Sequence, residues 1–525
     1  MCIMQAETKI QTRDPLDMSQ YTLEKLPKLP KTRLMVIIQK VGLVVGIFLF
    51  FYYHFKWGGT IEVFETQKKI APQLCYSMLG IFLASLVLWI TEAIPNYVTS
   101  MFVIIAVVLT GIMPEKKAFA FLGHPVMILN IASFILASML VATGVAKRIA
   151  LWFILKAGHH ATYIFWTFLF INLLLGAFVN ATAAKAALLM PLYMVICAIY
   201  GATGGEHRNN FGRNLVLQNL LGINVSCGAF LTGSAANLLA VSLLAGAGVK
   251  IFYADWFMAL APLAFIQLVI GIYVGTKLIF PLTKAEETPQ IEGGLDRIRA
   301  ELKAMGKISI DEIKASVIFL FVLAMWITEK KHGIPETTVA LIGAAVSLLP
   351  KIPGFIKLGV ISWNEVDIPW HLFMFSFGAY VLGGGIDSTH IVDLGVAHAF
   401  STLGIDEHTP KWLIFAGVSF VFAFLTLAME SKTARVLICF PVLIGIAQKF
   451  GWDILGFTLP MAFLINQVYV LYFNSKPATI CYLSNQYSSY DSFKYGIVML
   501  TIGWVLVILW AQYVMPLMGF KSTLW

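Results

Sequence analysis

Charged residues are scarce in this sequence of 525 residues: Asp, Glu, Lys and Arg make up 12% of the chain, whereas hydrophobic residues make up 59%. No soluble domain could bury so much apolar surface, so the composition predicts an all-α polytopic membrane protein. The net charge of +9 could indicate a nucleic-acid partner, but seven Lys and Arg residues fall within the first 40 positions. Membrane orientation explains this distribution better, and we expect no nucleic acid.

The sequence also lacks the marks of several other protein classes. Its six cysteines are scattered, mostly inside apolar runs, and indicate neither a disulfide framework nor a metal site. Aspartate-rich metal clusters and paired histidines are missing, which argues against a membrane enzyme. The first 33 residues contain no short apolar core with a cleavage site, so we interpret them as a cytoplasmic tail rather than a signal peptide.

The apolar runs predict five parts. They are a cytoplasmic N-terminal tail (1–33), an accessory transmembrane helix (34–56), a first repeat (74–281), an amphipathic cytoplasmic linker (282–314) and a second repeat (315–518). We interpret the mixed-charge linker as a solvated helix rather than a regulatory element. One helix at the front and five crossings per repeat give about eleven transmembrane segments, so the second repeat starts on the opposite side of the membrane. Such inverted-topology repeats place a transported substrate at their interface.

Two stretches carry the repeat most clearly: ATAAKAALLMP (181–191) and SKTARVLICFP (431–441). Each places one cation, Lys185 or Arg435, six residues before a proline and within otherwise apolar chain. A cation is costly in hydrocarbon, and irregular backbone is tolerated there only where it lines a protein or water cavity. Each stretch is compatible with a kinked helix or with the tip of a re-entrant hairpin, and we favour the hairpin, with tips near 180–185 and 430–435.

Other motifs repeat as well. The sequence WITE occurs at Trp89–Glu92 and again at Trp326–Glu329. Small and polar residues interrupt an apolar segment at LTGSAANLL (231–239), and FNSKPAT (473–479) interrupts the corresponding segment of the second half. Broken helices at corresponding places are typical of a transporter binding site.

These motifs together resemble the divalent anion:sodium symporter family, which includes di- and tricarboxylate carriers and dicarboxylate exchangers. The resemblance covers about residues 74–518, and WITEAIP is its most specific motif. It implies a homodimer in which hairpins and broken helices form a moving transport domain. It also implies a Ser-Asn-Thr triplet at each tip, whose side chains bind sodium and a substrate carboxylate.

The sequence departs from that pattern. The first triplet falls on Ala181, Thr182 and Ala183, and the second on Ser431, Lys432 and Thr433. In the first triplet, alanine replaces both the serine and the threonine of the family pattern. In the second, lysine replaces the asparagine. A fixed ammonium or guanidinium can neutralise a dianion as sodium does. We therefore expect fixed cations to replace sodium.

Fourteen residues are candidates for the site. For the substrate they are Thr182, Lys185, Asn237, Ser431, Lys432, Thr433, Arg435, Lys476 and Thr479. For a coupling ion, with less support, they are Asn180, Thr232, Gly233, Ser234 and Asn474. Arg435 can bind a carboxylate through two parallel hydrogen bonds, whereas lysine offers a point charge.

Several candidates have a structural alternative. Lys185 could extend toward water, Lys432 could pair with Glu430, and Lys476 could flank the membrane. The hydroxyl groups at the tips could cap helices. Glu92 and Glu329 in the WITE motifs are interpreted as structural anchors, and we assign His124, His371 and His390 to loops or the core.

These observations predict a secondary transporter for small dicarboxylates such as succinate, malate or 2-oxoglutarate. We expect sodium-independent exchange. The alternatives are a sodium- or proton-coupled symporter of di- or tricarboxylates or sulfate, and an anion channel, which the two hairpins disfavour. We expect no cofactor beyond a possible coupling Na+ or H+, and a location in the cell membrane with the N-terminus in the cytoplasm.

Overall fold

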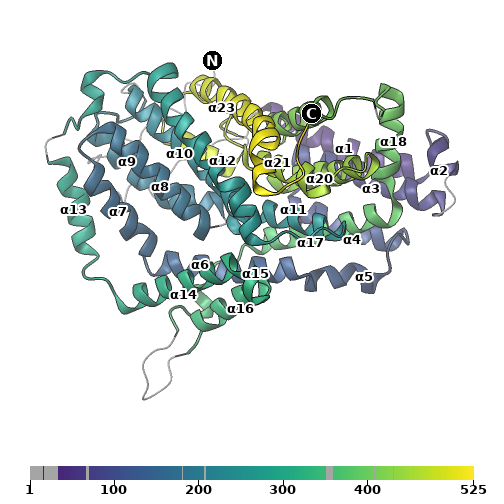
Figure 1. The fold of residues 1–525 in the computed structure, drawn as a ribbon, viewed down its shortest axis with the longest axis horizontal. Coiled ribbons are helices and arrows are strands. Elements are labelled where there is room, and N and C mark those ends of the chain that lie inside the picture. Colours follow the sequence, from purple (N-terminus) through teal and green to yellow (C-terminus); the bar gives the residue numbers. More distant parts are fainter. Residues whose placement is uncertain are drawn as a thin grey trace.

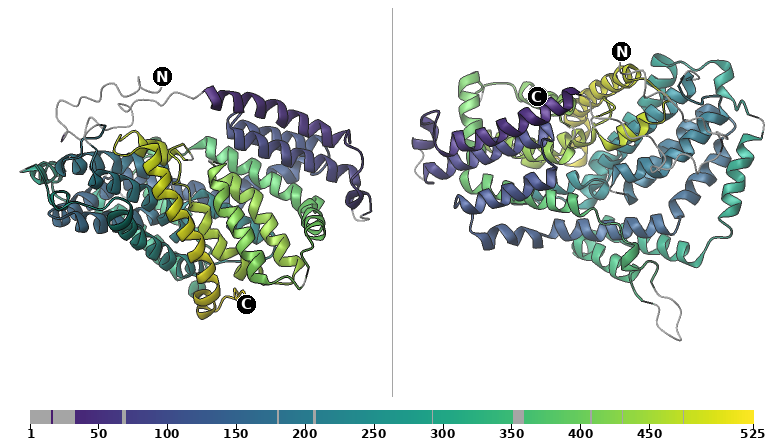
Figure 2. Two further views of the ribbon diagram at one scale, coloured as in Figure 1. Left: turned by 90° about the horizontal axis from the view of Figure 1, so that it is seen from above. Right: turned by 180° about the vertical axis from the view of Figure 1, so that it is seen from behind.

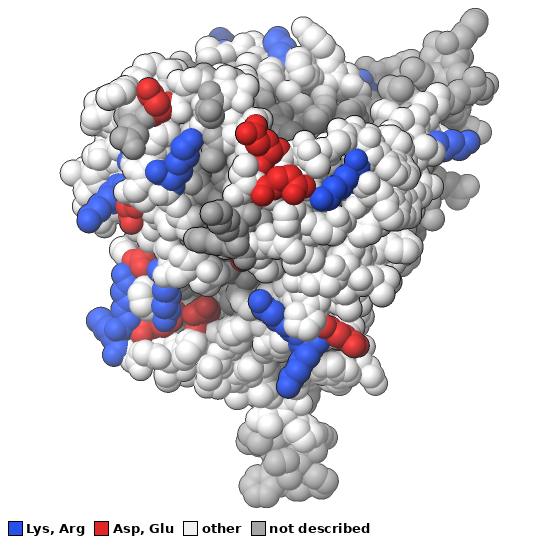
Figure 3. Space-filling view, turned by 90° about the vertical axis from the view of Figure 1, so that its right-hand side faces the viewer, with Lys and Arg blue, Asp and Glu red and all other residues white. Residues whose placement is uncertain are grey.

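The computed structural model describes residue 16 and residues 33–66, 70–179, 181–205, 208–291, 293–350, 359–406, 408–429, 431–473 and 475–525. This part of the chain forms α-helices joined by short 3₁₀- and π-helices, with no β-strand (Figure 1). The all-α prediction is therefore confirmed. Lys, Arg, Asp and Glu side chains form separate groups among larger uncharged areas on the face drawn in Figure 3.

The helices after residue 70 fall into two corresponding sets. The first comprises α3 (Pro72–Thr91), α4 (Asn96–Leu109), α5 (Glu115–Ala120), η2 (Phe121–Gly123), α6 (Pro125–Ala142), α7 (Val145–Ala157), α8 (Ala161–Phe178), α9 (Thr182–Ile199), α10 (Asn210–Ala229), η3 (Leu231–Gly233), α11 (Ala235–Gly246), α12 (Tyr253–Tyr273) and η4 (Val274–Ile279). The second comprises α14 (Ile310–Ile327), α15 (Glu329–His332), α16 (Glu336–Ser347), η6 (Trp363–Glu365), α17 (Trp370–Thr389), α18 (Ile391–Leu403), α19 (Lys411–Phe424), η7 (Leu425–Leu427), α20 (Lys432–Lys449), α21 (Ile454–Ala462), η8 (Phe463–Asn466), α22 (Lys476–Tyr482), α23 (Ser489–Leu509), η9 (Trp510–Val514) and η10 (Met515–Met518).

Matched lengths support this correspondence. Helices α9 and α20 both have 18 residues, and Pro191 and Pro441 occupy the same position in them. Helices α12 and α23 both have 21 residues, and each continues as a π-helix. The helices that leave the predicted tips, α9 and α20, and the last long helices of the two halves, α12 and α23, therefore correspond in length.

The WITE motif has the same structural role in both sets. The indole of Trp89 donates a hydrogen bond to the carbonyl of Asn96, and that of Trp326 donates to the carbonyl of Glu336. Asn96 is the first residue of α4 and Glu336 is the first residue of α16, and both indoles are buried. Each tryptophan thus fixes the turn between two apolar helices. The anchor predicted at Glu329 is buried and forms an ion pair with Lys250 at 3.4 Å.

Six apolar segments in the described part are long enough to span a membrane. They are Val36–His54, Pro72–Thr91, Glu115–Ala142, Thr182–Ile199, Tyr253–Ile279 and Ser489–Met518. Six shorter apolar helices accompany them, at Asn96–Leu109, Ala161–Ala177, Ala235–Gly246, Glu336–Ser347, Lys411–Leu427 and Ile454–Asn466. Short helices are what hairpins and broken spans require. The total of eleven spans stays a prediction.

The accessory segment predicted at 34–56 forms α1 (Arg33–His54), which runs along α3 (Figure 2). The contact is close because small residues lie in it: Gly46 faces Leu88, and Gly80 faces the backbone of Phe50. Small residues let helices approach each other in a membrane. A short helix, α2 (Glu62–Thr66), follows α1.

The linker contains η5 (Lys284–Glu287) and α13 (Gly294–Ala304). Within the stretch predicted as the linker, α14 already starts at Ile310, after an N-terminal capping box. Helix α13 is solvated on one face only, since it packs beside α7 at the edge of the molecule (Figure 1). Arg148 on α7 donates to the carbonyls of Met305 and Gly306 and forms a 2.9 Å ion pair with Glu312. The linker is therefore bound to the first repeat.

The two repeats interlock around the predicted tips. Helix α11 of the first repeat packs against α20 of the second, and α22 of the second packs against α9 of the first. Helix α10 also contacts η8. Each hairpin therefore meets a broken helix of the other repeat, and this junction holds the candidate site.

Candidate anion-binding site

Both predicted tips are hairpins. In the first, the rings of Phe168 on α8 and Tyr193 on α9 are 5.1 Å apart, and the Tyr200 hydroxyl donates to the Gly158 carbonyl at 2.9 Å. In the second, the ring centroids of Phe422 on α19 and Phe440 on α20 are 6.1 Å apart. These contacts join the distant parts of each pair of arms, which a single kinked helix could not do.

The two cations occupy equivalent positions. Lys185 and Arg435 are each the fourth residue of the helix that leaves the tip, and both side chains are completely buried. The Lys185 ammonium lies 2.6 Å from the Cys227 sulfur on α10. Extension of Lys185 into water is therefore not observed. Repetition of the hairpin has placed one buried cation behind each tip.

Arg435 has unused hydrogen-bonding capacity. Its Nη2 donates to the Ile465 carbonyl at 2.6 Å, whereas Nε and Nη1 have no hydrogen-bond partner in the described part of the chain. A buried guanidinium with free donors is costly unless an acceptor binds to it. Nε and Nη1 point to different sides of the guanidinium, so each suits a separate acceptor oxygen of a bound anion.

The third cation, Lys432, starts a hydrogen-bond chain that joins the tips. Its ammonium donates to Oδ1 of Asn466 at 3.3 Å, and the Asn466 amide donates to Oδ1 of Asn237 at 2.8 Å. The Asn237 amide in turn donates to the carbonyls of Cys227 and Phe230. The chain therefore runs from the second tip through both broken helices to the residue that contacts Lys185.

Positive charge dominates the site. Lys432 is close enough to both Lys185 and Arg435 for electrostatic repulsion. Within the described residues, no carboxylate forms an ion pair with any of the three cations. Glu430, the predicted partner of Lys432, lies outside the described residues. Burial of unpaired like charges costs several kcal/mol each, so an anion with two or more charges would stabilise this arrangement.

The first helix break is tightly packed. A Cβ on Gly233 would lie 2.4 Å from the Cys227 carbonyl oxygen, so only glycine fits. Thr232 is buried, and the Ser234 hydroxyl caps α11 by accepting from the Ala236 amide.

The second helix break is longer than the sequence predicts. Helix α21 ends at Ala462 and η8 at Asn466, and the chain resumes helical structure only at Lys476. Asn180 and Asn474, two of the predicted ion ligands, lie outside the described residues.

The remaining candidates lie apart from the buried cations or act in capping. Lys476 is exposed at the start of α22, where its charge acts on His371. The Thr479 hydroxyl donates to the carbonyls of Tyr472 and Ser475. Ser431 caps α20 by accepting from the Ala434 amide, and Thr182 and Thr433 are half-buried at their tips. The structure thus brings together Lys185, Asn237, Lys432 and Arg435.

Sequence reasoning missed Cys227, Asn466 and the Ile465 carbonyl. Asn466 could have been recognised from the sequence, because Asn466 and Gln467 are two adjacent polar residues in an apolar run. Behind the site, the side chains of Gln467 and Gln267 exchange two hydrogen bonds of 2.9 and 3.0 Å across the repeats. Both buried amides are thereby satisfied.

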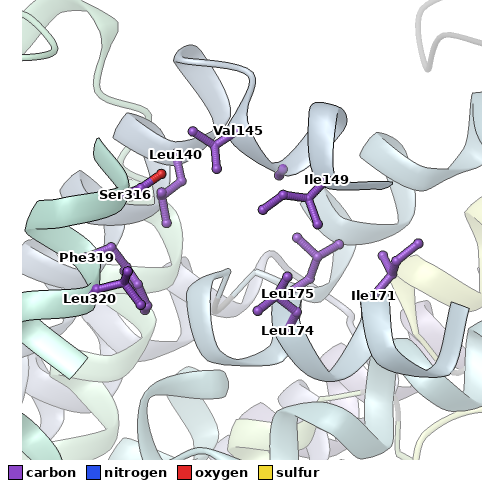
Figure 4. Close-up of a pocket in the computed structure, with 10 residues that line it drawn as sticks. Leu140, Val145, Ile149, Ile171, Leu174, Leu175, Ser316, Phe319 and Leu320 are labelled. Carbon is purple, nitrogen blue, oxygen red and sulfur yellow. The ribbon is translucent and has the colours of Figure 1, made fainter. Parts of the chain in front are cut away.

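A separate cavity of about 200 Å³ lies between α6, α7, α8 and α14 (Figure 4). Its lining includes Leu140, Ile149, Leu175, Phe319 and Leu320, with Ser316 as its polar residue. This lining contains no charged side chain, so the cavity does not suit a small anion.

Two interlocked helical repeats with hairpins, broken helices and buried polar residues at their junction define a membrane transporter of the repeat class. A family comparison agrees. The chain belongs to the family described as the sodium:sulfate symporter transmembrane region, whose model matches residues 67–520. This match confirms the resemblance drawn from the motifs. It also confirms that the protein is a transporter rather than an enzyme.

Two relatives and one solved structure illustrate the similarity. The chain is 24% identical to the sodium-dependent dicarboxylate transporter SdcS of Staphylococcus saprophyticus, over 91% of this chain and 92% of the relative. It is 25% identical to the chloroplastic dicarboxylate transporter 2 of Spinacia oleracea, over 83% and 76%. The Alcanivorax borkumensis YdaH transporter superposes with a TM-score of 0.50 at 12% identity, over 93% of this chain and 99% of that one, which supports the fold alone.

Proposed function

We propose that this protein carries small divalent organic anions, C4 or C5 dicarboxylates such as succinate, malate and 2-oxoglutarate, by alternating access. The observation that carries the proposal is the cluster of Lys185, Lys432 and Arg435, in which Lys185 and Arg435 are completely buried and Lys432 is half-buried. None of the three has a carboxylate ion-pair partner among the described residues. The two relatives named as dicarboxylate transporters support the same substrate class.

We further propose exchange without sodium. Fixed cations beside the substrate take over the charge neutralisation that a sodium ion would supply. At the first break, the carbonyls of Cys227 and Phe230 already accept hydrogen bonds from Asn237. When empty, the site carries uncompensated positive charge, and a buried charge opposes passage through a low-dielectric barrier. Substrate must then be bound in each direction.

Sodium symport is the second candidate, because SdcS is named as sodium-dependent. Proton-coupled symport, and di- or tricarboxylates or sulfate as substrates, belong to the same alternative. We place the protein in the cell membrane with a cytoplasmic N-terminus, and we expect a homodimer from the family resemblance. The paired hairpins favour a carrier over an anion channel.

The test is uptake of labelled succinate into proteoliposomes. The vesicles contain either 2-oxoglutarate or no dicarboxylate, and the external buffer contains sodium or choline at fixed pH. We expect uptake that requires internal dicarboxylate and is the same in both buffers. Uptake that requires sodium and proceeds into vesicles without internal substrate would support the symport alternative and refute exchange.

A further inference from the structure

Cys227 lies in the cation cluster without a role in the proposed transport cycle. It is completely buried near the end of α10, with its sulfur 2.6 Å from the Lys185 ammonium. The thiol donates to the Ile223 carbonyl at 3.1 Å. Lys432 is also close enough to interact electrostatically with Cys227. A group that becomes anionic on this sulfur would therefore face at least two ammonium groups.

We propose that Cys227 is an oxidation-sensitive thiol within the anion site, and that its sulfinate form takes the place of a substrate carboxylate and stops transport. The inference rests on the proposed function, because it assumes that the substrate anion binds to the same cations. In addition to binding a substrate, the site would then undergo a covalent modification, the oxidation of Cys227 by hydrogen peroxide.

The chemistry needs two equivalents of peroxide. In the first step a sulfur–oxygen bond forms, the O–O bond of peroxide breaks, and water leaves, so that the thiol becomes a sulfenic acid. A second peroxide adds another oxygen in the same way and gives a sulfinic acid and a second water. The sulfur is oxidised by two electrons in each step and each peroxide is reduced by two. The sulfinic acid then releases its proton to water.

The product resembles the proposed ligand. A sulfinate has one negative charge shared by two oxygens, as a carboxylate has, and the Lys185 ammonium already lies beside the sulfur. Two free donors of Arg435, Nε and Nη1, lie in the same buried cluster. Because the anion is tethered, it competes with substrate at an effective concentration of the order of millimolar. Peroxide is smaller than a dicarboxylate, so a site that opens to substrate also admits the oxidant.

Cys439 provides the matched control. It lies one turn beyond Arg435 on α20 and is near enough to interact with that guanidinium, but its side chain is partly exposed. Cys227→Ser keeps a small polar side chain that cannot form a sulfinate, and Cys439→Ser removes the control thiol. Each variant is compared with its own untreated exchange rate.

Reconstituted protein is treated with peroxide while it exchanges succinate. The exchange rate is then measured, and the oxidation state of each cysteine is determined by peptide mass spectrometry. We expect exchange to fall about tenfold or more in wild type and in Cys439→Ser, because the tethered anion outcompetes dilute substrate. Cys227→Ser should keep most of its untreated rate. Loss of exchange in Cys227→Ser equal to that of wild type would overturn the proposal.

A second measurement needs no variant. In wild type, the anionic reagent 2-sulfonatoethyl methanethiosulfonate should label Cys227 faster than neutral methyl methanethiosulfonate, and succinate should slow the labelling. Full oxidation of Cys227 with unchanged exchange, or labelling indifferent to succinate, contradicts the inference alone. Protein that does not exchange dicarboxylates before any treatment contradicts the proposed function.

Discussion

The guanidinium of Arg435 should determine how tightly the substrate binds. Of its three nitrogens, Nη2 donates to the Ile465 carbonyl at 2.6 Å, so Nε and Nη1 are the donors left for the oxygens of a bound anion. Arg435→Lys keeps the positive charge but cannot offer two donors in a fixed plane. The variant therefore separates the hydrogen-bond geometry from the charge.

The size of the effect follows from these contacts. A hydrogen bond to a charged group contributes about 1.5–3 kcal/mol, and loss of one of two such bonds should weaken binding by about 10- to 100-fold. We expect the half-saturating concentration of succinate in exchange to rise by that factor. Arg435→Gln removes the charge as well and should have the larger effect. The measurement is the initial rate of labelled succinate exchange against external concentration.

Arg148→Lys is the matched control, because Arg148 binds the linker and not the cation cluster. It should leave the half-saturating concentration unchanged. Gel-filtration profiles in detergent check that all variants fold. An unchanged half-saturating concentration in folded Arg435→Lys would show that the free donors of Arg435 do not bind substrate, and the reasoning from the unpaired guanidinium would be refuted.

Four further outcomes follow from packing and charge. Gly233→Ala would place a Cβ 2.4 Å from a backbone oxygen of α10, so we expect a lower melting temperature in detergent, with a cost of about 1–3 kcal/mol. Asn466→Asp adds a carboxylate beside Lys432, and succinate exchange should show a half-saturating concentration raised about tenfold, since one cation is then neutralised. Arg148→Ala leaves the linker without its main anchor and should lower thermal stability by about 2 kcal/mol. Lys147→Ala removes a half-exposed ion pair and should change stability by less than about 1 kcal/mol.

The repeat could be predicted from the sequence because short local patterns of residues occur in both halves of the chain. A cation followed six residues later by a proline occurs twice within otherwise apolar chain, and the helices that contain these patterns start at equivalent positions, Thr182 and Lys432. The cost of a charge in hydrocarbon also made Lys185 and Arg435 candidates for the site from the sequence alone. These inferences need no knowledge of which helices pack together.

The partners of these cations could not be predicted in the same way. Cys227 and Ile465 are 42 and 30 residues away from the side chains that they contact, and their positions depend on how α10 and η8 cross the hairpins. The neighbour of the linker helix could not be predicted for a related reason. A helix with one apolar face can lie on a membrane or on another helix, and the sequence of α13 does not distinguish α7 from lipid.

The two tips have diverged in a way that bears on coupling. The first contributes Lys185 alone, whereas the second contributes Lys432 and Arg435, so the site holds three basic side chains, of which Lys185 and Arg435 are completely buried. A bound dianion leaves one positive charge, which is less costly to move through the membrane interior than three. In exchange, the loaded carrier crosses in both directions with the same residual charge. No net charge is then transferred in a complete cycle of dianion for dianion, so fixed cations can replace sodium without making transport depend on the membrane potential.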